Sequence, residues 1–194
     1  MQDKAALRRA ALSKRRALTD RDHQAAEARL VSLCDDLNIA PGATVAGFWP
    51  IRREINPLPL MRILRDRGAR LCLPAVVDAV TIVFRHWCLD AELIETGFGT
   101  MGPDESAPVV DPDVILVPIA AFDRRGGRIG YGAGYYDRAI ETLHAGGRRP
   151  DLIGLAFACQ ETDRVPLEPH DQLLHRIVTE LELIQCQTDD HPAR

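Results

Sequence analysis

The stretch VILVPIAAFDRRGGRIGYGAGYYDR, Val114 to Arg138, decides the fold. Its first five residues form an apolar run typical of a buried strand. Five glycines then follow between Gly126 and Gly134. A helix is expected next, from about residue 135 to residue 145. A strand, a glycine-rich turn and a helix in this order predict one βα unit of an α/β domain.

The segments on both sides continue this alternation of strands and helices. Two helices are expected between residues 4 and 37, separated at LTDRD, where Thr19 or Asp20 can cap the second helix and Asp22 lies in its first turn. A third helix should begin after Asn56, with proline as its first residue, and end at glycine 68. Strands are expected at residues 44–49, 70–74, 81–87, 114–118 and 152–157, with one or two more in RIVTELELI and a long loop over 89–112.

The strands are apolar runs, which is typical of a parallel sheet covered on both faces. We therefore expect a single α/β domain over residues 1–194, with three layers and a largely parallel central sheet. The helical segment 1–37 should pack on this domain, and residues 188–194 should be frayed. In domains of this class the ligand binds beyond the carboxyl ends of the strands.

The composition places the chain among ordinary globular domains. Of its 194 residues 46% are hydrophobic and 27% charged, and the net charge is -4. The negative charge argues against nucleic acid and anionic membranes as partners. The basic amino terminus lacks the apolar core of a signal peptide, and serine is too scarce for a typical transit peptide. Five cysteines without a CxxC pair fit a reducing compartment. We expect a cytoplasmic protein without an obligate protein partner.

The glycine-rich stretch has the composition of a phosphate-binding loop. Glycines let successive backbone N–H groups converge on an anion, and the following helix adds its own free N–H groups. The stretch is neither a Walker A loop nor a dinucleotide fingerprint, and an ordinary turn explains the glycines equally well. The neighbouring Arg128, Tyr135, Tyr136 and Asp137 favour phosphate binding. A carboxylate beside phosphates implies Mg²⁺ between them.

A second polar cluster lies in VPLEPHDQLLHRIVTE. It contains Glu168, His170, Asp171 and His175, and the spacing of its histidines is not that of a zinc pair. A structural turn is the commoner role for such residues. Asp171 becomes a candidate metal ligand if the fold brings it beside Asp137, because two carboxylates can share one hard cation.

Three further charged residues are candidates for the same site. Lys4 and Arg8 lie four residues apart and so share one face of the first helix, where both can reach a phosphate. By default such residues are solvated surface charges. Glu54 follows the first strand, where ligand contacts collect, although an exposed loop carboxylate is the commoner case.

Six segments extend over nearly the whole chain: KAALRRAALSKRRAL, FWPIRREINPLPL, LVPIAAFDRRGGRIGYGAGYYDR, GLAFACQ, VPLEPHD and IVTE. Together, in this order and spacing, they resemble the 5-formyltetrahydrofolate cyclo-ligase family, also called methenyltetrahydrofolate synthetase. The resemblance implies a fold similar to that of sugar-phosphate isomerases and CoA transferases. It also implies conversion of 5-formyltetrahydrofolate to 5,10-methenyltetrahydrofolate through phosphorylation of the formyl oxygen and attack by N10. ATP would be the co-substrate and Mg²⁺ the cofactor, with release of ADP and phosphate.

The resemblance also implies roles for individual residues, with Arg128 and Tyr136 catalytic. Mg²⁺ would be bound by Asp137 and Asp171. The residues binding ATP would be Lys4, Arg8, Arg128, Ile129, Gly130, Tyr131, Gly132, Ala133, Gly134, Tyr135 and Tyr136. The residues binding the folate would be Trp49, Glu54, Tyr131, Gly132, Gly134 and Tyr135.

One position departs from the pattern of the family. Some relatives carry lysine where this chain has Ala133, so that lysine's contribution to phosphate or folate binding is either absent here or replaced, with Arg124 and Arg125 as the candidates. Two alternatives to the cyclo-ligase activity are a different enzyme on a related fold and a non-catalytic nucleotide-binding module. Neither accounts as well for the matches at both ends of the chain.

Overall fold

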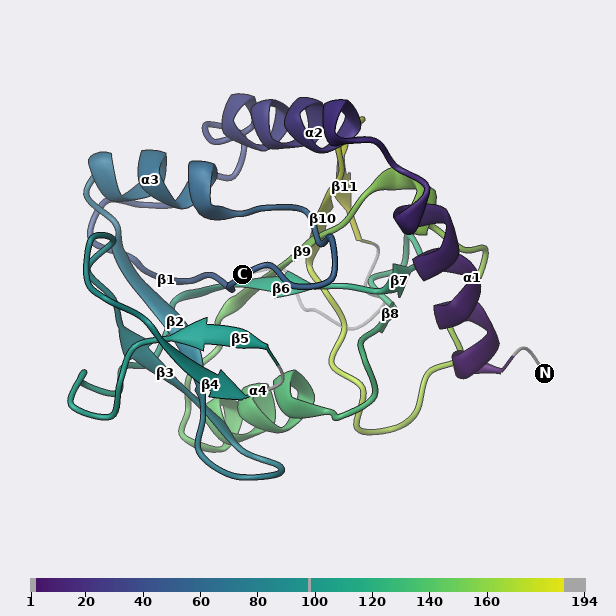
Figure 1. Ribbon diagram of the computed structural model, residues 1–194. Coiled ribbons are helices and arrows are strands. Elements are labelled where there is room, and N and C mark those ends of the chain that lie inside the picture. Colours follow the sequence, from purple (N-terminus) through teal and green to yellow (C-terminus); the bar gives the residue numbers. More distant parts are fainter. Residues whose placement is uncertain (1–2, 98, 187–194) are drawn as a thin grey trace.

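A seven-stranded sheet forms the centre of the computed structural model, which describes residues 3–97 and 99–186 (Figure 1). The expectation for residues 188–194 lies outside this range. The strand order is β11-β10-β9-β6-β1-β2-β3, and only the two edge strands run antiparallel to their neighbours. The sheet is therefore largely parallel, as expected. Its strands are β1 (Thr44–Ala46), β2 (Arg70–Val76), β3 (Ile82–His86), β6 (Val114–Pro118), β9 (Asp151–Leu155), β10 (Arg176–Val178) and β11 (Leu183–Gln185).

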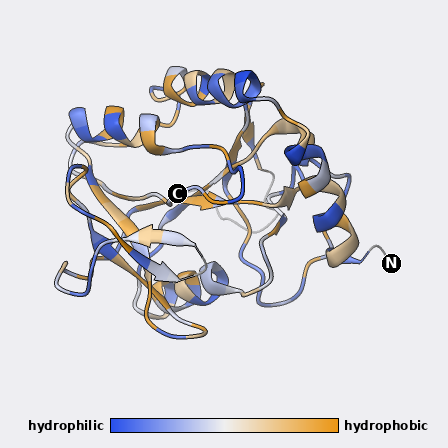
Figure 2. Ribbon diagram, viewed as in Figure 1, coloured by the Kyte–Doolittle hydropathy of each residue, from blue (hydrophilic) through white to orange (hydrophobic). Residues whose placement is uncertain are grey.

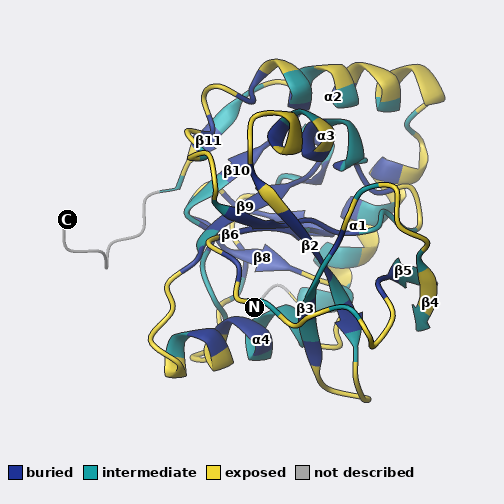
Figure 3. Cartoon of the chain, turned by 90° about the vertical axis from the view of Figure 1, so that its left-hand side faces the viewer, coloured by how far each residue is buried: buried dark blue, intermediate teal, exposed yellow. Residues whose placement is uncertain are grey.

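Helices cover both faces of the sheet and complete the three layers. On one face lie α2 (Asp20–Ser32) and α3 (Leu58–Asp66), whose Leu30 and Leu60 share a buried cluster with Val45 and Leu116. On the other lies α4 (Tyr135–Ala145), which buries its apolar side against the sheet. The apolar central strands and the polar outer surfaces of the helices are visible in Figure 2, and the buried middle layer in Figure 3. Burial on both faces explains why the strands are apolar runs.

The first helix, α1 (Lys4–Arg16), does not join either outer layer. It contacts β7 (Ala121–Phe122) and the short 3₁₀ helix η1 (Ala158–Gln160). Ala11 of α1 packs with Ala121, Ile129 and Val165 in a small separate core. Figure 1 shows α1 beside β7 and β8 (Arg128–Ile129), the elements that follow the carboxyl end of β6. No helix among the described residues is both long and apolar enough to span a membrane.

The local capping signals were read correctly at α2 and nearly so at α3. Thr19 and Asp22 form a reciprocal capping box at the start of α2. At α3 the N-cap is Pro57, one residue later than expected, and the side chain of Asn56 accepts the Leu58 N–H at 3.1 Å. Short-range hydrogen bonds of this kind depend on neighbouring residues alone, which is why sequence predicts them well.

Two strand predictions were wrong in detail. The first strand pairs only as far as residue 46, although Phe48 beyond it is buried. The expected loop over 89–112 contains a hairpin of β4 (Ile94–Gly97) and β5 (Thr100–Gly102), which packs against β2. Such short strands carry little periodic signal, because their pairing depends on contacts with a distant part of the chain.

Candidate active site

The glycine-rich segment begins as a tight hairpin of β7 and β8 that Asp123 organises. The buried Asp123 carboxylate accepts the Arg125 N–H at 3.0 Å, the Gly127 N–H at 3.1 Å and the Val165 N–H at 2.8 Å. Gly126 has a φ of 89°, and a Cβ there would lie 2.3 Å from the carbonyl oxygen of Leu174. Glycine is therefore required at this position for both conformation and space.

The second half of the segment, residues 130–134, is more open and leads directly into α4. Gly130, Gly132 and Ala133 are exposed, and Gly132 and Gly134 have φ values of 105° and 67°. Gly134 is the N-cap of α4, and no side chain caps the helix. The backbone N–H groups of the first helical turn thus lack side-chain acceptors at an accessible end of the sheet. This arrangement suits an anion such as phosphate.

Helix α1 brings two basic side chains to this segment. The Arg8 Nε donates to the carbonyl oxygen of Gly130 at 2.7 Å, and its guanidinium lies beside Gly132. The Lys4 Nζ lies 2.7 Å from Asp171 and 3.5 Å from Glu168. Lys4 and Arg8 are thus engaged with the loop and with the carboxyl-terminal turn, and the default interpretation as solvated surface charges was wrong.

Arg128 and Asp137 form a largely buried ion pair. The Arg128 guanidinium donates to Asp137 Oδ1 at 2.6 Å and also to the carbonyl oxygen of Gln172, whose N–H lies 3.2 Å from the same Asp137 oxygen. Burial lowers the pKa of Arg128 against the opposing effect of Asp137. Because Gln172 follows Asp171, these contacts bring the turn at 168–172 against the start of α4. The fold thereby places Asp137 next to the turn that carries Asp171.

Asp171 lies in a second, more open polar group. Its carboxylate accepts from Lys4 and from the Glu168 N–H at 2.8 Å. Burial alone would raise the pKa of Asp171, but these hydrogen bonds outweigh burial and lower the pKa. Glu168, His170 and Asp171 offer potential metal-binding atoms within 4.8 Å of one another, a group that does not include Asp137. The carboxylates on both sides are oxygen ligands of the type that Mg²⁺ prefers.

Glu54 is buried, with a relative exposure of 6%, so the default view of it as an exposed loop carboxylate was wrong. Its Oε2 accepts the Ile51 N–H at 2.9 Å. Burial raises the pKa of Glu54, and the nearby Arg15 and Arg52 charges partly oppose this effect. Burial and the nearby Glu54 charge raise the pKa of Tyr131 to about 12. The fold thus unites Glu54 with a residue of the glycine-rich loop.

The tyrosines at the start of α4 point to different surroundings. The Tyr135 hydroxyl donates to the carbonyl oxygen of Ala79 at 3.0 Å, in the loop after β2. Tyr136, in the first turn of α4, packs against the core. Burial raises the pKa of Tyr136, so its hydroxyl remains a hydrogen-bond donor at neutral pH.

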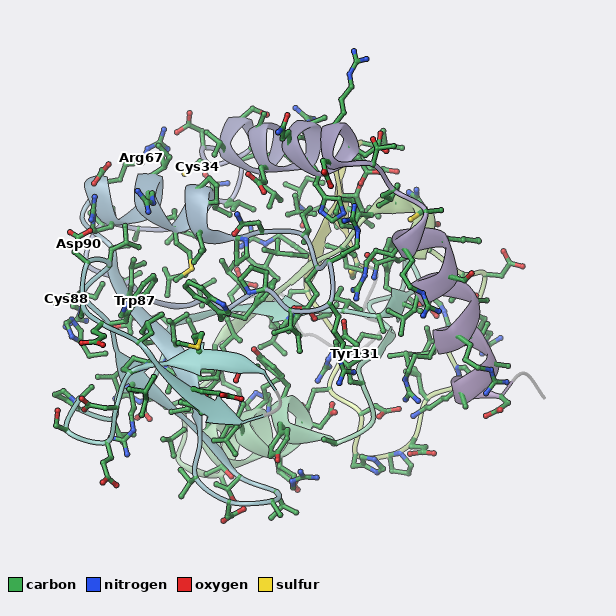
Figure 4. The ribbon with its side chains drawn as sticks, viewed as in Figure 1. Cys34, Arg67, Trp87, Cys88, Asp90 and Tyr131 are labelled. Carbon is green, nitrogen blue, oxygen red and sulfur yellow. The ribbon has the colours of Figure 1, made fainter. Side chains whose placement is uncertain are left out.

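Trp49 lines a cavity to which Glu54 does not contribute. This apolar cavity of about 330 Å³ is also lined by Leu58 and Arg62 of α3 and by Trp87, Leu93 and Met101. Neither Glu54 nor any residue of the glycine-rich loop is among the residues lining this cavity. In Figure 4, Trp87 lies below α3, whereas Tyr131 lies toward α1. Among the described residues, the predicted folate contacts therefore form two groups.

The two candidates for replacing a lysine at position 133, Arg124 and Arg125, are engaged in ion pairs elsewhere. Arg124 is paired with Glu161 and Glu182, and Arg125 with Asp123. The basic residue beside Ala133 is Arg138, whose Nη2 donates to the Ala133 carbonyl oxygen at 2.6 Å. Helical geometry explains this contact, because Arg138 lies in the turn that follows the loop.

Sequence reasoning missed two buried charged residues in the site. Asp123 was overlooked although an aspartate before a glycine pair is a recognised turn signal. Arg15 has a relative exposure of 2% and donates to Tyr131 and to the Arg52 carbonyl oxygen. Its spacing from Lys4 and Arg8, at residues 4, 8 and 15, places all three on one helix face. That spacing was the available signal.

Comparison with known proteins agrees with this geometry. A family profile described as the 5-formyltetrahydrofolate cyclo-ligase family matches residues 1–180. A protein named 5-formyltetrahydrofolate cyclo-ligase from Mycolicibacterium smegmatis is 33% identical over 184 residues, covering 91% of this chain and 93% of its own. A protein of the same name from Escherichia coli K12 is 30% identical and covers 70% of this chain and 77% of its own.

Two solved structures of 5,10-methenyltetrahydrofolate synthetases share the fold. The one from Aquifex aeolicus has a TM-score of 0.79 at 27% identity and covers 98% of this chain and 96% of its own. The one from Mycoplasma pneumoniae has a TM-score of 0.72 at 25% identity and covers 92% and 99%. The similarity extends over the amino-terminal helix and the carboxyl-terminal turn as well as the loop between them. The chain belongs to the 5-formyltetrahydrofolate cyclo-ligase family.

Proposed function

We propose that this enzyme uses Mg-ATP to cyclise 5-formyltetrahydrofolate to 5,10-methenyltetrahydrofolate, releasing ADP and phosphate. One observation carries the proposal. Lys4 and Arg8 from one end of the chain, and Asp171 from the other, meet at the glycine-rich loop through contacts of 2.7 Å. An accessible helix N-terminus with basic side chains and carboxylates around it is suited to binding a triphosphate with its metal.

The proposed reaction begins with transfer of the γ-phosphoryl group to the formyl oxygen, which breaks the bond between that phosphorus and the ADP oxygen. N10 then attacks the formyl carbon and loses its proton, and the carbon–oxygen bond breaks as phosphate leaves. The reaction needs alignment and charge neutralisation more than a protein nucleophile. Lys4, Arg8 and the loop N–H groups would align the phosphates and neutralise their charge. Tyr136, whose phenol is neutral, would donate a hydrogen bond to the reacting groups.

Asp137 and Asp171 are the proposed ligands of Mg²⁺, which would neutralise phosphate charge during transfer. Each has one oxygen engaged by a basic side chain, Arg128 or Lys4. Two carboxylates from the protein are sufficient for this ion, because Mg²⁺ usually retains several waters and binds substrate phosphates as well. Arg128 would hold Asp137 in place while adding positive charge near the phosphates.

Glu54 and Tyr131 are the proposed contacts for the pterin ring, and Trp49 for the apolar part of the folate. A buried carboxylate can accept hydrogen bonds from adjacent N–H and amino groups of the ring. The cavity beside Trp49 offers aromatic and aliphatic contact to an aromatic ligand. The loop residues next to Tyr131 would then bring the formyl group to the γ-phosphate.

A direct assay tests the proposed function. The protein is mixed with Mg-ATP and 5-formyltetrahydrofolate, the near-ultraviolet absorbance of the methenyl product is followed, and ADP is measured in parallel. We expect product and ADP to form in equal amounts. Binding of ATP without turnover would instead indicate a nucleotide-binding module, and turnover of a different substrate would indicate another enzyme on the same fold.

Asp137→Asn is expected to raise the Mg²⁺ concentration needed for half-maximal activity by at least about tenfold. Removing a residue that only hydrogen-bonds to a metal ligand already lowers metal affinity by about this factor, and loss of a ligand should lower it at least as much. The amide oxygen can still accept from Arg128 and Gln172, so the protein should fold. Activity is measured against Mg²⁺ concentration. Asp163→Asn is the control, because Asp163 is exposed. An unchanged Mg²⁺ requirement in the Asp137 variant would remove this residue from the metal site.

The folate KM is expected to rise as the pH falls toward the pKa of Glu54. Burial raises that pKa above its usual value of 4.5, so protonation begins at a higher pH than for an exposed glutamate. The protonated form accepts fewer hydrogen bonds from the pterin. The KM is measured from pH 8 to pH 5 for the wild type and for Glu54→Gln, whose side chain does not titrate. Parallel profiles for the two proteins would contradict this role for Glu54.

A further inference from the structure

Arg15 joins three segments that lie far apart in the sequence. It extends from α1, and its Nη2 donates to the Tyr131 hydroxyl at 2.5 Å and to the carbonyl oxygen of Arg52 at 2.9 Å. Tyr131 belongs to the glycine-rich loop, and Arg52 belongs to the turn that precedes Glu54. With a relative exposure of 2%, Arg15 is among the largest fully buried side chains of the described chain. Burial of a guanidinium is costly unless it is well paired.

The turn that Arg15 contacts has an unfavourable backbone conformation. Arg52 and Arg53 are consecutive non-glycine residues with φ values of 49° and 62°. Residues with side chains adopt this left-handed region at a cost, which the surrounding structure must offset. The bond from Arg15 holds the Arg52 carbonyl, and the Arg53 guanidinium donates to the Leu18 carbonyl oxygen at 2.8 Å. The end of α1 and the residues after it therefore clamp the turn.

The same contacts fix the surroundings of Glu54. The Tyr131 hydroxyl accepts a hydrogen bond from Arg15, and Glu54 lies near enough for its charge to help raise the pKa of Tyr131. The guanidinium of Arg52 also lies over the Tyr131 ring, with Cζ 5.2 Å from its centroid. Tyr131 is thus held from two sides, and the Glu54 carboxylate accepts a hydrogen bond from the Ile51 N–H of its own turn.

One donor of Arg15 adds a further cost to the arrangement. The Nε of Arg15 is buried and has no hydrogen-bond partner among the described residues. A buried donor left without a protein partner is destabilising. The remaining bonds of Arg15 all lead to the loop and to the turn that carries Glu54. The side chain that carries this energetic penalty is therefore the one that bonds to both the loop and the turn.

We propose that Arg15 is a positioning residue that connects the phosphate-binding loop to the folate-binding turn, and that its bonds to Tyr131 and to the Arg52 carbonyl hold the turn in the conformation that orients Glu54. This inference rests on the proposed function, because it takes Glu54 as a folate contact. It assigns Arg15 no contact with either substrate. Since Tyr131 lies in the loop and Glu54 in the turn, nucleotide in the loop should favour the arrangement that binds folate. Folate affinity should then be higher in the presence of a non-hydrolysable ATP analogue.

Arg15→Met tests the proposal, because methionine fills the apolar part of the space without donating. We expect the folate KM to rise about tenfold to a hundredfold, the usual range for losing a hydrogen bond from a charged group, with a smaller change in the ATP KM. The enhancement of folate binding by the ATP analogue should disappear. Arg15→Lys should restore little, because an ammonium lacks the planar fork that reaches two acceptors. Arg16→Met is the control, since Arg16 is exposed on the same helix.

A double-mutant cycle with Tyr131→Phe separates positioning from general stabilisation. If Arg15 acts through the tyrosine hydroxyl, the double variant should have a folate KM close to that of the worse single variant. Melting temperatures are measured for every variant. Equal losses for folate and ATP, additive effects in the cycle, or full rescue by Arg15→Lys would each overturn the proposal. If Arg15→Met fails to fold, Arg15→Lys and Tyr131→Phe carry the same comparison of folate and ATP.

The wild type distinguishes this inference from the proposed function. If the wild type neither turns over 5-formyltetrahydrofolate with Mg-ATP nor gains thermal stability from that folate, the proposed function fails. If the wild type does both and Arg15→Met matches it in folate KM, only the role of Arg15 fails.

Discussion

Replacing Arg128 with methionine is expected to lower kcat by about a hundredfold to a thousandfold, or ~3 to 4 kcal/mol of transition-state stabilisation, as for other single charge-stabilising donors. Arg128 is buried and holds the carboxylate of Asp137 at 2.6 Å. Its loss would remove positive charge from the proposed phosphate site and free a proposed metal ligand. Both effects act on phosphoryl transfer, so kcat should fall more than the folate KM rises.

Steady-state kinetics at saturating Mg²⁺ measure this effect, with melting temperature as a separate readout. Some loss of stability is expected as well, because removing one partner of a buried ion pair leaves the other uncompensated. Arg164→Met is a suitable control, since Arg164 is exposed. A folded Arg128→Met protein that differs from the wild type only in folate KM would show that Arg128 does not act on the phosphates.

Replacing Asp123 with alanine is expected to lower the free energy of unfolding by roughly 2 to 6 kcal/mol. The carboxylate accepts the N–H groups of Gly127 and Val165, which lie in a buried part of the hairpin. Each buried donor left without an acceptor costs about 1 to 3 kcal/mol. The melting temperature should fall by roughly 5 to 20 °C for a chain of this size. Because Asp123 shapes the loop, ATP-dependent activity should decline with stability.

Urea and thermal denaturation followed by circular dichroism measure the loss for Asp123→Ala, Asp123→Asn and the exposed control Asp163→Ala. The asparagine variant retains one acceptor oxygen, so its loss should lie between those of the other two. A loss below about 1 kcal/mol in Asp123→Ala, within the range of ordinary surface substitutions, would mean that another group satisfies these N–H donors.

The parts of the fold that sequence predicted well are those with a local cause. The β6 strand and the start of α4 match the expected boundaries, because an apolar run and a glycine-rich turn determine them without reference to the rest of the chain. The α1–α2 boundary also matches, because the Thr19 capping box involves residues three apart. The short pairs β4–β5 and β7–β8 were missed, because their pairing depends on packing against other elements.

The candidate site shows the same division. Its loop composition and the charged residues of α1 were recognisable in the sequence. The resemblance to a family then assigned both to one predicted ATP site. Their contacts were not predictable from residue spacing. Arg8 bonds to Gly130 across 122 residues of sequence, and Lys4 to Asp171 across 167. Only the folded chain brings such distant groups into hydrogen-bonding range.

The sequence by itself determined the class of fold, the position of the glycine-rich loop and the family. Each depends on local composition or on the order of motifs along the chain. The tertiary structure decided that Glu54 and Arg15 are buried, that Arg128 is paired with Asp137, and that Arg138 instead of Arg124 lies beside Ala133. Burial and pairing are properties of packing between distant segments. Desolvation by that packing raises the pKa of Glu54. The same packing brings Arg15 within hydrogen-bonding distance of both the loop and the turn.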